Sequence, residues 1–545
     1  MPRRPPFAGE HRPPFATATN SKESTEPDRK VNGFGKMSAV DFPALIPTAG
    51  KRTKILRAPM QFDFLHIAPL VALAHLLGVI AACHAILNTR TSQGAVAWAV
   101  SLVAMPYLTV VPYLFLGRSK FRGYADARRI ENESLRTQAH PHAWDEQASS
   151  AGRPTEELGH RLVRSLTHLG GMPFLPGNSV RTLVNGEATF AAILEAIDQA
   201  RSYIVVQFFI VRDDALGEML KDALLAKAAQ GVRIYFLYDS IGSFDLPHSY
   251  VARLRAGGVE VHPFATNRRF VNRFQLNFRN HRKIVSVDGE RAFVGGHNVG
   301  VEYLGARPPL SPWRDTHIEV RGPVVASIQF VFTEDWYWAT QTLPPLDMPP
   351  YRPDGEPGEP GDQGMHCIVM PTGPADKQET CSLFFVEAIN AARERIWITT
   401  PYLVPDEAVF SALRLAVLRG VDVRILIPSR RDHYVVFEAS KLYAYDSVNA
   451  GIRIFRYRPG FLHQKVVLID TVAAAIGSAN LDNRSFRLNF EIMVLTVDRG
   501  FATEVEAMLT RDFAESYEID RNEYRQAPAF RRVTMHVARL FSPIL

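Results

Sequence analysis

Two histidines of this chain stand in the same arrangement of chemically capable residues. His281 is followed by Lys283 and Asp288, and the same His-x-Lys-x4-Asp spacing returns in His463, Lys465 and Asp470. Each aspartate is followed after seven positions by a glycine and after ten by an asparagine, namely Gly295 with Asn298 and Gly477 with Asn480. One copy would indicate only a surface histidine beside a surface lysine. The duplicated set, with its shared glycine and asparagine, indicates two copies of one site.

These residue types suit the transfer of a phosphodiester. One imidazole can attack phosphorus and form a covalent phospho-histidine. A second imidazole can protonate the departing oxygen and later take a proton from the incoming hydroxyl. Lysine ammonium and asparagine amide groups can hold the charge on the non-bridging oxygens in the transition state. We therefore expect neither a metal nor a cofactor, and the sequence shows no His-Glu-x-x-His or paired Cys-x-x-Cys spacing.

The segments around the two motifs repeat as well, and they indicate the elements that position the site. The matching pairs are 195–206 with 387–398, 231–234 with 420–423, and 258–261 with 451–454. Each half reads as helix, strand, helix, strand, helix, strand, followed by the motif on a further apolar run. This alternation predicts an α/β fold. Because the repeat is far longer than a solenoid unit, it indicates two fused copies of one domain.

The duplicated motif resembles the signature of the phospholipase D superfamily, and further segments resemble bacterial cardiolipin synthases. In the first half these segments are 280–283, 295–298 and 313–316; in the second they are 401–405, 462–465, 477–482, 484–486, 489–491 and 539–543. The resemblance extends from about residue 60 to the C-terminus. It implies two phospholipase D-like α/β sandwich domains with the active site at their interface.

The resemblance also implies a role for each histidine and for two acidic residues. His281 and His463 are expected to be the nucleophile and the general acid/base. An acidic residue on a following strand is expected to orient each ring, and Asp315 and Glu491 occupy those places. The sequence does not settle which histidine attacks first; His281 is our preferred nucleophile.

The remaining motif residues are expected to hold the phosphate or to brace the motif. The phosphate-holding set is Lys283, Lys465, Asn298 and Asn480. Asp288 and Asp470 complete the catalytic motif, and in relatives they are closer to a structural brace than to the phosphate.

Two long apolar runs predict a transmembrane hairpin before the repeats. Residues 65–87 and 95–116 are almost free of charge, and each is long enough to span a bilayer. Two buried core helices are the alternative, although two adjacent runs of this length are rare in soluble domains. Basic residues lie outside the pair, at positions 51, 52, 54, 57, 118, 120 and 122, and only Arg90 lies between the spans. This bias predicts a multi-pass protein of the bacterial inner membrane with both catalytic halves in the cytoplasm.

Composition and linker signals complete the predicted organisation. The net charge of +6 permits an anionic partner, and the hairpin favours acidic lipid over nucleic acid. Three cysteines without framework spacing are consistent with a reducing cytoplasm. The predicted parts are a disordered tail (1–50), the transmembrane hairpin (60–118), a connector (119–150), the first domain (151–342), a Pro/Gly/acidic linker (343–364) and the second domain (365–545). Met37 is an alternative start.

Two segments have the composition of membrane-surface contacts. Residues 268–274 interleave arginines with aromatic residues just before the first motif. Near the C-terminus, one predicted helical face carries Val533, Val537, Leu540, Phe541 and Ile544. Docking of that face onto the protein's own core is an equally good explanation.

The resemblance implies a cardiolipin synthase that joins two phosphatidylglycerol molecules and releases glycerol through a phosphatidyl-histidine. The expected partners are phosphatidylglycerol and an anionic phospholipid bilayer, with no nucleic acid; the oligomeric state is left open. A hydrolytic phospholipase D would use the same residues, and analysis of its products would distinguish it. A phospholipase D-like nuclease and a non-catalytic membrane scaffold are the further alternatives.

Overall fold

The computed structural model describes residues 64–89, 92–117, 152–265, 277–346 and 364–545. The predicted disordered tail, the predicted connector, segment 268–274 and most of the predicted linker lie outside these residues.

The N-terminal apolar region forms three helices, α1 (Phe64–Asn88), α2 (Ser92–Ala104) and α3 (Pro106–Leu116). Among the described residues, α1 is the one helix long and apolar enough to cross a membrane, with a mean hydropathy of 2.3 over Ala68–Asn88. The sequence predicts one continuous span over 95–116, but the structure divides it at Met105, whose φ of −141° and ψ of 58° are not helical. Pro106 explains this break, because its ring excludes the residue before it from the helical region.

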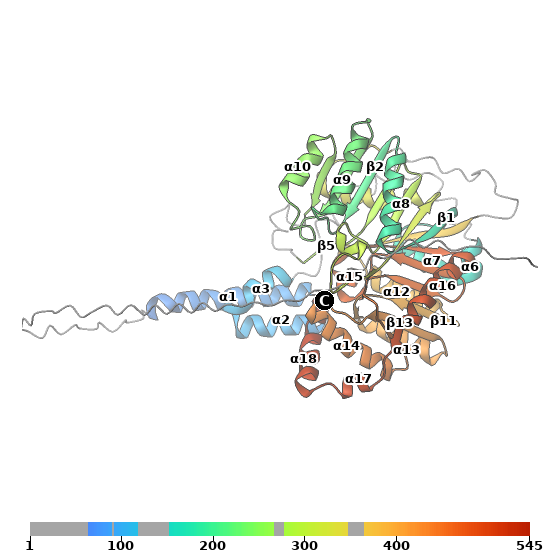
Figure 1. The fold of residues 1–545 in the computed structure, drawn as a ribbon. Coiled ribbons are helices and arrows are strands. Elements are labelled where there is room, and N and C mark those ends of the chain that lie inside the picture. The colour runs from blue at the N-terminus through green and yellow to red at the C-terminus, as the bar shows by residue number, and fades with distance from the viewer. Residues whose placement is uncertain (1–63, 90–91, 118–151, 266–276, 347–363) are drawn as a thin grey trace, which may run out of the picture. The chain divides into compact units, whose positions relative to one another are not determined.

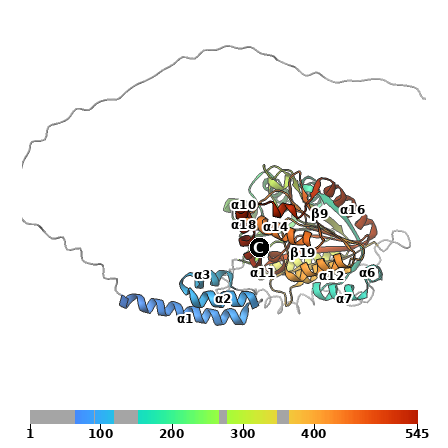
Figure 2. The same cartoon turned by 90° about the horizontal axis from the view of Figure 1, so that it is seen from below.

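The three helices lie side by side (Figure 2) and share one small buried cluster. Ala82 and Ala85 of α1 lie against Leu102 and Tyr113. Gly78 permits the close approach, because a Cβ there would lie 2.4 Å from the carbonyl oxygen of Leu102. Large apolar side chains elsewhere on α1, α2 and α3 remain exposed.

Both halves of the catalytic region follow the predicted alternation of helices and strands. The first half contains α6 (Gly152–Leu158), α7 (His160–Gly170), β1 (Leu175–Val184), α8 (Asn185–Gln199), β2 (Tyr203–Phe208), α9 (Ala215–Ala228), β3 (Arg233–Asp239), α10 (His248–Ala256), β4 (Glu260–Phe264), β5 (Arg279–Asn280), β6 (Ile284–Val287), β7 (Arg291–Gly295), η2 (Val301–Leu304), β8 (Trp313–Arg314), β9 (Thr316–Arg321) and α11 (Val324–Thr340). The predicted order from 185 to 287 is confirmed.

The second half repeats this order and adds a helical C-terminus. It contains β10 (Met365–Thr372), α12 (Thr380–Ala391), β11 (Arg395–Thr399), β12 (Leu403–Val404), α13 (Glu407–Leu418), β13 (Asp422–Pro428), α14 (Tyr434–Asn449), β14 (Arg453–Tyr457), β15 (Phe461–Leu462), β16 (Val466–Ile469), β17 (Ala473–Gly477), β18 (Leu481–Asp482), α15 (Asn483–Arg487), β19 (Asn489–Val497), α16 (Arg499–Ala514), β20 (Ser516–Glu518), α17 (Asn522–Arg525), α18 (Ala529–Leu540) and η3 (Ser542–Ile544).

The strands of both halves join in one sheet (Figure 1). Its order is β20-β14-β13-β11-β16-β17-β19-β10-β1-β9-β7-β6-β2-β3-β4, and β5 pairs with β19 at the side. Apart from β20, the order in one half is that of the other half reversed. The halves meet where β1 and β10 pair in antiparallel fashion. This continuity places β9 of one half and β19 of the other near the centre, and these strands position the site.

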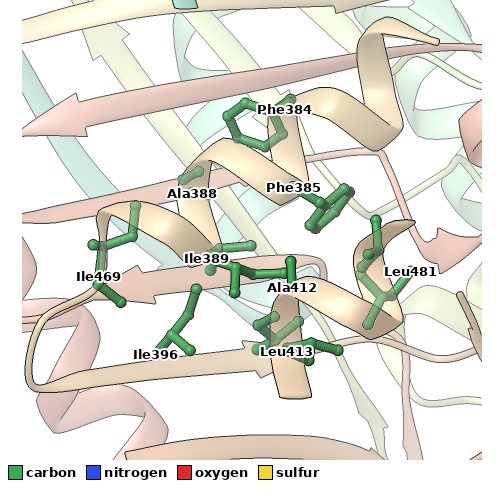
Figure 3. Packing of buried hydrophobic residues seen from close by; sticks show 14 of the residues in the cluster. Phe384, Phe385, Ala388, Ile389, Ile396, Ala412, Leu413, Ile469 and Leu481 are labelled. Atoms are coloured by element: carbon green, nitrogen blue, oxygen red, sulfur yellow. The ribbon is translucent and has the colours of Figure 1, made fainter. Parts of the chain in front are cut away.

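Several helices begin at an aspartate whose side chain accepts from the first backbone N–H groups, as is usual for a helix N-cap. Asp214 caps α9, Asp406 caps α13 and Asp498 caps α16. The helices then cover the sheet through apolar faces. Figure 3 shows Ile389 of α12 close to Ile396 and Leu413, and Phe384 and Phe385 of the same helix belong to this buried cluster. These buried layers give the strand ends rigid support.

Candidate active site

Each candidate catalytic histidine is held by a strand of the opposite half. β5, which ends just before His281, pairs in parallel with the first residues of β19. β15, which ends just before His463, pairs in the same way with β8. The backbone N–H of His281 donates to the carbonyl of Phe490 at 2.9 Å, and that of His463 donates to Arg314 at 2.8 Å. The two motifs are therefore interlocked by backbone pairing.

The same crossing brings each ring to a carboxylate of the other half. Nδ1 of His281 lies 2.9 Å from Oε2 of Glu491, and Nδ1 of His463 lies 2.7 Å from Oδ2 of Asp315. Since an ionised carboxylate only accepts hydrogen bonds, Nδ1 must carry the proton in both contacts. The other ring nitrogen, Nε2, then has its lone pair available for chemistry. The family resemblance implied both acids, and the structure adds that each one contacts the histidine of the opposite half.

Both rings are neutral at neutral pH. Burial lowers the pKa of each histidine to about 4, although Glu491 favours the charged form of His281 and Asp315 favours that of His463. The charges of Lys283 and Lys465 also lower these pKa values, and each of the two lysines acts on both rings. The mutual influence indicates that His281 and His463 belong to one site.

The two carboxylates stay ionised despite complete burial. Burial alone would raise the pKa of Asp315, but His297, His463 and Lys465 hold it below its usual range. Burial opposes ionisation of Glu491 as well, and His281 and Lys283 nevertheless keep its pKa low.

Hydrogen bonds fix the orientation of both acids. Glu491 accepts from the hydroxyls of Ser478 at 2.6 Å and Ser485 at 2.9 Å. Asp315 accepts from the backbone N–H of Thr316 at 2.8 Å. In the first half Gly296 takes the place of Ser478, and a Cβ at Gly296 would lie 2.0 Å from Oδ1 of Asp315. The Gly-Gly and Gly-Ser pairs of the two motifs therefore accommodate the two acids differently.

The lysines of both motifs turn back over their own histidines. Nζ of Lys283 donates to the carbonyl of His281, and Nζ of Lys465 donates to that of His463. Nζ of Lys465 also lies 3.0 Å from Nδ1 of His463. Burial lowers the pKa of Lys465 to about 8 and that of Lys283 well below its usual value, while Glu491 and Asp315 oppose both shifts.

The two motif asparagines are buried and already make contacts. The amide of Asn298 donates to the hydroxyl of Tyr303 at 2.8 Å, and its oxygen accepts from the N–H of Ile210. The amide of Asn480 donates to Asp482 at 3.2 Å. Tyr303 in turn lies against the ring of His463, with 6.3 Å between ring centroids. The structure thus connects Asn298 to the opposite histidine through a tyrosine.

Asp288 and Asp470 lie at the opposite ends of β6 and β16 from the motif lysines. Asp288 accepts from the backbone N–H groups of 201, 202 and 203, and Asp470 accepts from those of 393, 394 and 395. Both residues also have positive φ angles. Their geometry is that of a brace between two loops.

Two buried Arg–Asp pairs, which sequence reasoning did not identify, support the crossed strands. Arg282 bonds both oxygens of Asp335 at 2.8 Å and donates through Nε to the backbone carbonyl of Glu491. Arg314 bonds both oxygens of Asp512 at 2.7 Å and donates to the carbonyl of Asp315. Each guanidinium therefore fixes the backbone of a histidine-orienting acid. Asp335 and Asp512 lie on α11 and α16, outside the motif, and spacing alone does not mark them.

Aromatic residues enclose the two rings unequally. His463 lies near Trp313, Phe461 and Tyr303, with centroid distances of 5.3, 6.0 and 6.3 Å. His281 packs edge-on against Phe209 at 5.0 Å. Of these aromatic residues, only Trp313 lies in a segment that carries the family resemblance, 313–316.

Fold and site together define a member of the phospholipase D superfamily. A model described as "Cardiolipin synthase, PLD-like domain" matches residues 193–307 and again 385–513. Among solved structures, phosphatidylserine synthase of Haemophilus influenzae is similar over 71% of this chain and 100% of its own, with a TM-score of 0.54 and 16% identity. At that identity the likeness concerns the fold alone.

Curated relatives narrow the assignment. Cardiolipin synthase A of Pseudomonas aeruginosa is 60% identical over 469 residues, which cover 86% of this chain and 94% of the relative. Cardiolipin synthase A of Pseudomonas fluorescens is 58% identical over 476 residues, which cover 87% and 98%. The chain belongs to the cardiolipin synthase family, the phosphatidyltransferases of the phospholipase D superfamily.

Proposed function

We propose that the chain transfers a phosphatidyl group between two phosphatidylglycerol molecules and yields cardiolipin and glycerol. The observation that carries this proposal is the crossed pair of neutral histidines, each with Nδ1 on a carboxylate of the other half. Such a pair offers two Nε2 atoms with different duties, as two successive displacements at phosphorus require.

In the first step Nε2 of one histidine, by preference His281, attacks the phosphorus of the donor lipid. A P–N bond forms, the P–O bond to glycerol breaks, and the other histidine supplies the proton to the departing oxygen. In the second step that histidine takes the proton from the terminal hydroxyl of the acceptor phosphatidylglycerol. The new P–O bond replaces the P–N bond, so the enzyme returns to its starting state without a nucleotide.

Charges around the rings support this division of labour. The lowered pKa values make both histidines neutral, yet one must be protonated to act as an acid. A phosphodiester carries a negative charge, and its binding between the rings favours an imidazolium. Lys283 and Lys465 hold the non-bridging oxygens, with Asn298 and Asn480 as further phosphate ligands after rearrangement of their present contacts.

Transfer to a lipid hydroxyl prevails over hydrolysis if the acceptor is concentrated beside the site and water is excluded. A membrane anchor provides this concentration. We propose that α1 and the α2–α3 pair form a hairpin in the bacterial inner membrane, followed by two phospholipase D-like domains (151–342 and 365–545) on the cytoplasmic side. The partners of the protein in this proposal are phosphatidylglycerol and the anionic bilayer, and nucleic acid is not among them.

Product analysis tests the reaction. The purified protein in phosphatidylglycerol vesicles should release glycerol in step with cardiolipin, and added glycerol should reverse the reaction. Exhaustive chelation in detergent should leave the rate largely unchanged, because side chains supply the phosphate contacts. Phosphatidic acid as the main product would instead identify a hydrolase. Release of CMP from a CDP-activated lipid, or a strict need for a divalent ion in the chemical step, would refute this mechanism.

Thiol labelling tests the topology, in a Cys83→Ser background. Basic residues flank the apolar region on both outer sides, so the turn between α1 and α2 should face the periplasm. A cysteine in place of Ser92 should react with an impermeant reagent in cells whose outer membrane is permeable. One in place of Ser149 should react only after the inner membrane is opened. The reverse pattern would place the catalytic halves outside the cytoplasm.

A further inference from the structure

The C-terminal helix α18 has two apolar faces with different surroundings. One face contributes Met535 and Ala538, which are buried, and Ala538 packs with Val436 and Ala439 of α14. Two ion pairs hold this face in place: Arg539 lies 2.6 Å from Asp446, and Arg531 lies 3.5 Å from Glu438. The helix is therefore docked on the catalytic region through this side.

The second face remains uncovered. Its residues follow a helical stripe and are exposed by 75, 62, 48, 77 and 48%, in the order Phe530, Val533, Val537, Leu540 and Phe541. Four of the five residues on the predicted apolar face are therefore exposed, namely Val533, Val537, Leu540 and Phe541. These four residues do not dock onto the protein's own core. A contiguous exposed apolar stripe of this kind marks a surface that binds a membrane or another protein.

The charge on α18 indicates what covers the stripe. The helix contains Arg531, Arg532 and Arg539 and no acidic residue. Arg531 and Arg539 also make the ion pairs to α14, and Arg532 lies between them and the stripe around the helix. A basic helix with an exposed apolar stripe matches a bilayer with anionic headgroups, where the apolar stripe enters the acyl boundary.

The C-terminal residues that follow α18 are also connected to the site. The carbonyl of Leu545 accepts from the backbone N–H of Arg484 in α15 at 2.7 Å. The neighbouring Ser485 donates to Glu491, which orients His281. The residues that follow α18 are therefore bonded to α15, which carries a hydrogen-bond partner of Glu491.

We propose that α18 is an interfacial helix whose stripe Phe530, Val533, Val537, Leu540 and Phe541 enters the anionic bilayer from which the substrate is drawn. The proposal rests on the proposed function, because it assigns the surface through which this lipid enzyme meets its substrate. It is separate from the anchoring assigned to α1.

Glutamates in the stripe test the proposal in the full-length protein. In phosphatidylglycerol vesicles Val533→Glu/Val537→Glu should lower the rate at least about tenfold, since both residues would leave the acyl boundary. In mixed micelles, where detergent delivers the lipid, the same variant should keep the wild-type rate. Leu415→Glu/Leu418→Glu is the matched control, because these exposed leucines of α13 lie on another helix; it should retain activity in both media.

A fluorescence measurement gives a readout independent of activity. In a Cys83→Ser background, in which Cys367 and Cys381 are buried, a dye on Val533→Cys should be quenched by brominated phosphatidylglycerol. A dye on Leu418→Cys should not be quenched. Equal quenching at both positions, or none at 533, would overturn the proposal. The proposal would also be overturned if the glutamate variant had a lower oligomeric mass than the wild-type protein and the dye at 533 were not quenched. A second copy of the chain would then cover the stripe. If the wild-type protein makes no cardiolipin in either medium, the proposed function fails, while the quenching still decides the membrane contact.

Discussion

Replacement of either His281 or His463 by alanine should lower the rate of cardiolipin formation by about 10⁴-fold or more, with the double variant hardly slower, because groups that act as one unit are strongly non-additive. Each ring has a duty that the other cannot take over within one turnover. The rates are to be compared in phosphatidylglycerol micelles with wild-type protein. Substantial synthesis by either single variant would contradict a mechanism that uses both histidines.

The loss should come from chemistry and not from unfolding. Without His281, Glu491 keeps hydrogen bonds from Ser478 and Ser485. Without His463, Asp315 keeps the N–H of Thr316. Thermal unfolding of both variants should therefore stay cooperative, and this measurement is the control for the rates.

Asp315→Asn and Glu491→Gln should each reduce the rate by about 10³- to 10⁴-fold, as expected when an amide replaces the carboxylate that sets a histidine tautomer. An amide can donate to Nδ1 and thereby move the ring proton to Nε2, where the lone pair is needed. Glu319→Gln is the matched control. Glu319 lies on β9, which begins directly after Asp315, and is also a buried carboxylate, but it pairs with arginines and not with a catalytic ring. A rate loss in Glu319→Gln as large as in Asp315→Asn would show that burial of the charge, and not the contact to His463, causes the effect.

Much of the site follows from sequence because the repeat preserves residue types at fixed spacing. The spacing predicted His281 with Lys283 and the equivalent pair in the second half, and the family resemblance added both acids. It could not show that Asp315 serves His463, since this depends on β8 pairing with β15 across the two halves. Pairing between strands more than a hundred residues apart leaves no periodic signal in either strand.

The asparagines that are predicted to hold the phosphate show a similar limit. The sequence gives Asn298 an amide donor, and the structure shows that this donor is bonded to Tyr303. Contacts of this kind depend on side-chain packing, which motif spacing does not encode. The role of Asn298 toward phosphate stays a prediction.

In the helical regions hydropathy identified apolar segments but not their interruptions or their buried faces. Pro106 lies inside the apolar run 95–116, and hydropathy does not register the restriction that its ring places on the backbone of Met105. In α18 the sequence showed an apolar stripe, but the docking face consists of Met535 and Ala538, with ion pairs to α14. The periodicity of a helix shows which residues share a face, but it does not show which face packs on the rest of the protein.

A burst experiment tests the central claim, that one histidine of a crossed pair carries the phosphatidyl group while the other moves protons. The substrate is the p-nitrophenyl ester of phosphatidic acid, whose leaving group departs without a proton. One of the two variants His281→Ala and His463→Ala should release about one equivalent of nitrophenolate in a burst. Mass spectrometry should then find the phosphatidyl group on the remaining histidine of that variant. Because His281 is our preferred nucleophile, we expect this burst in His463→Ala. Asp315→Asn should then behave like His463→Ala, and Glu491→Gln like His281→Ala. A burst in both alanine variants, a burst in neither, or the opposite matching of the two acid variants would contradict the account.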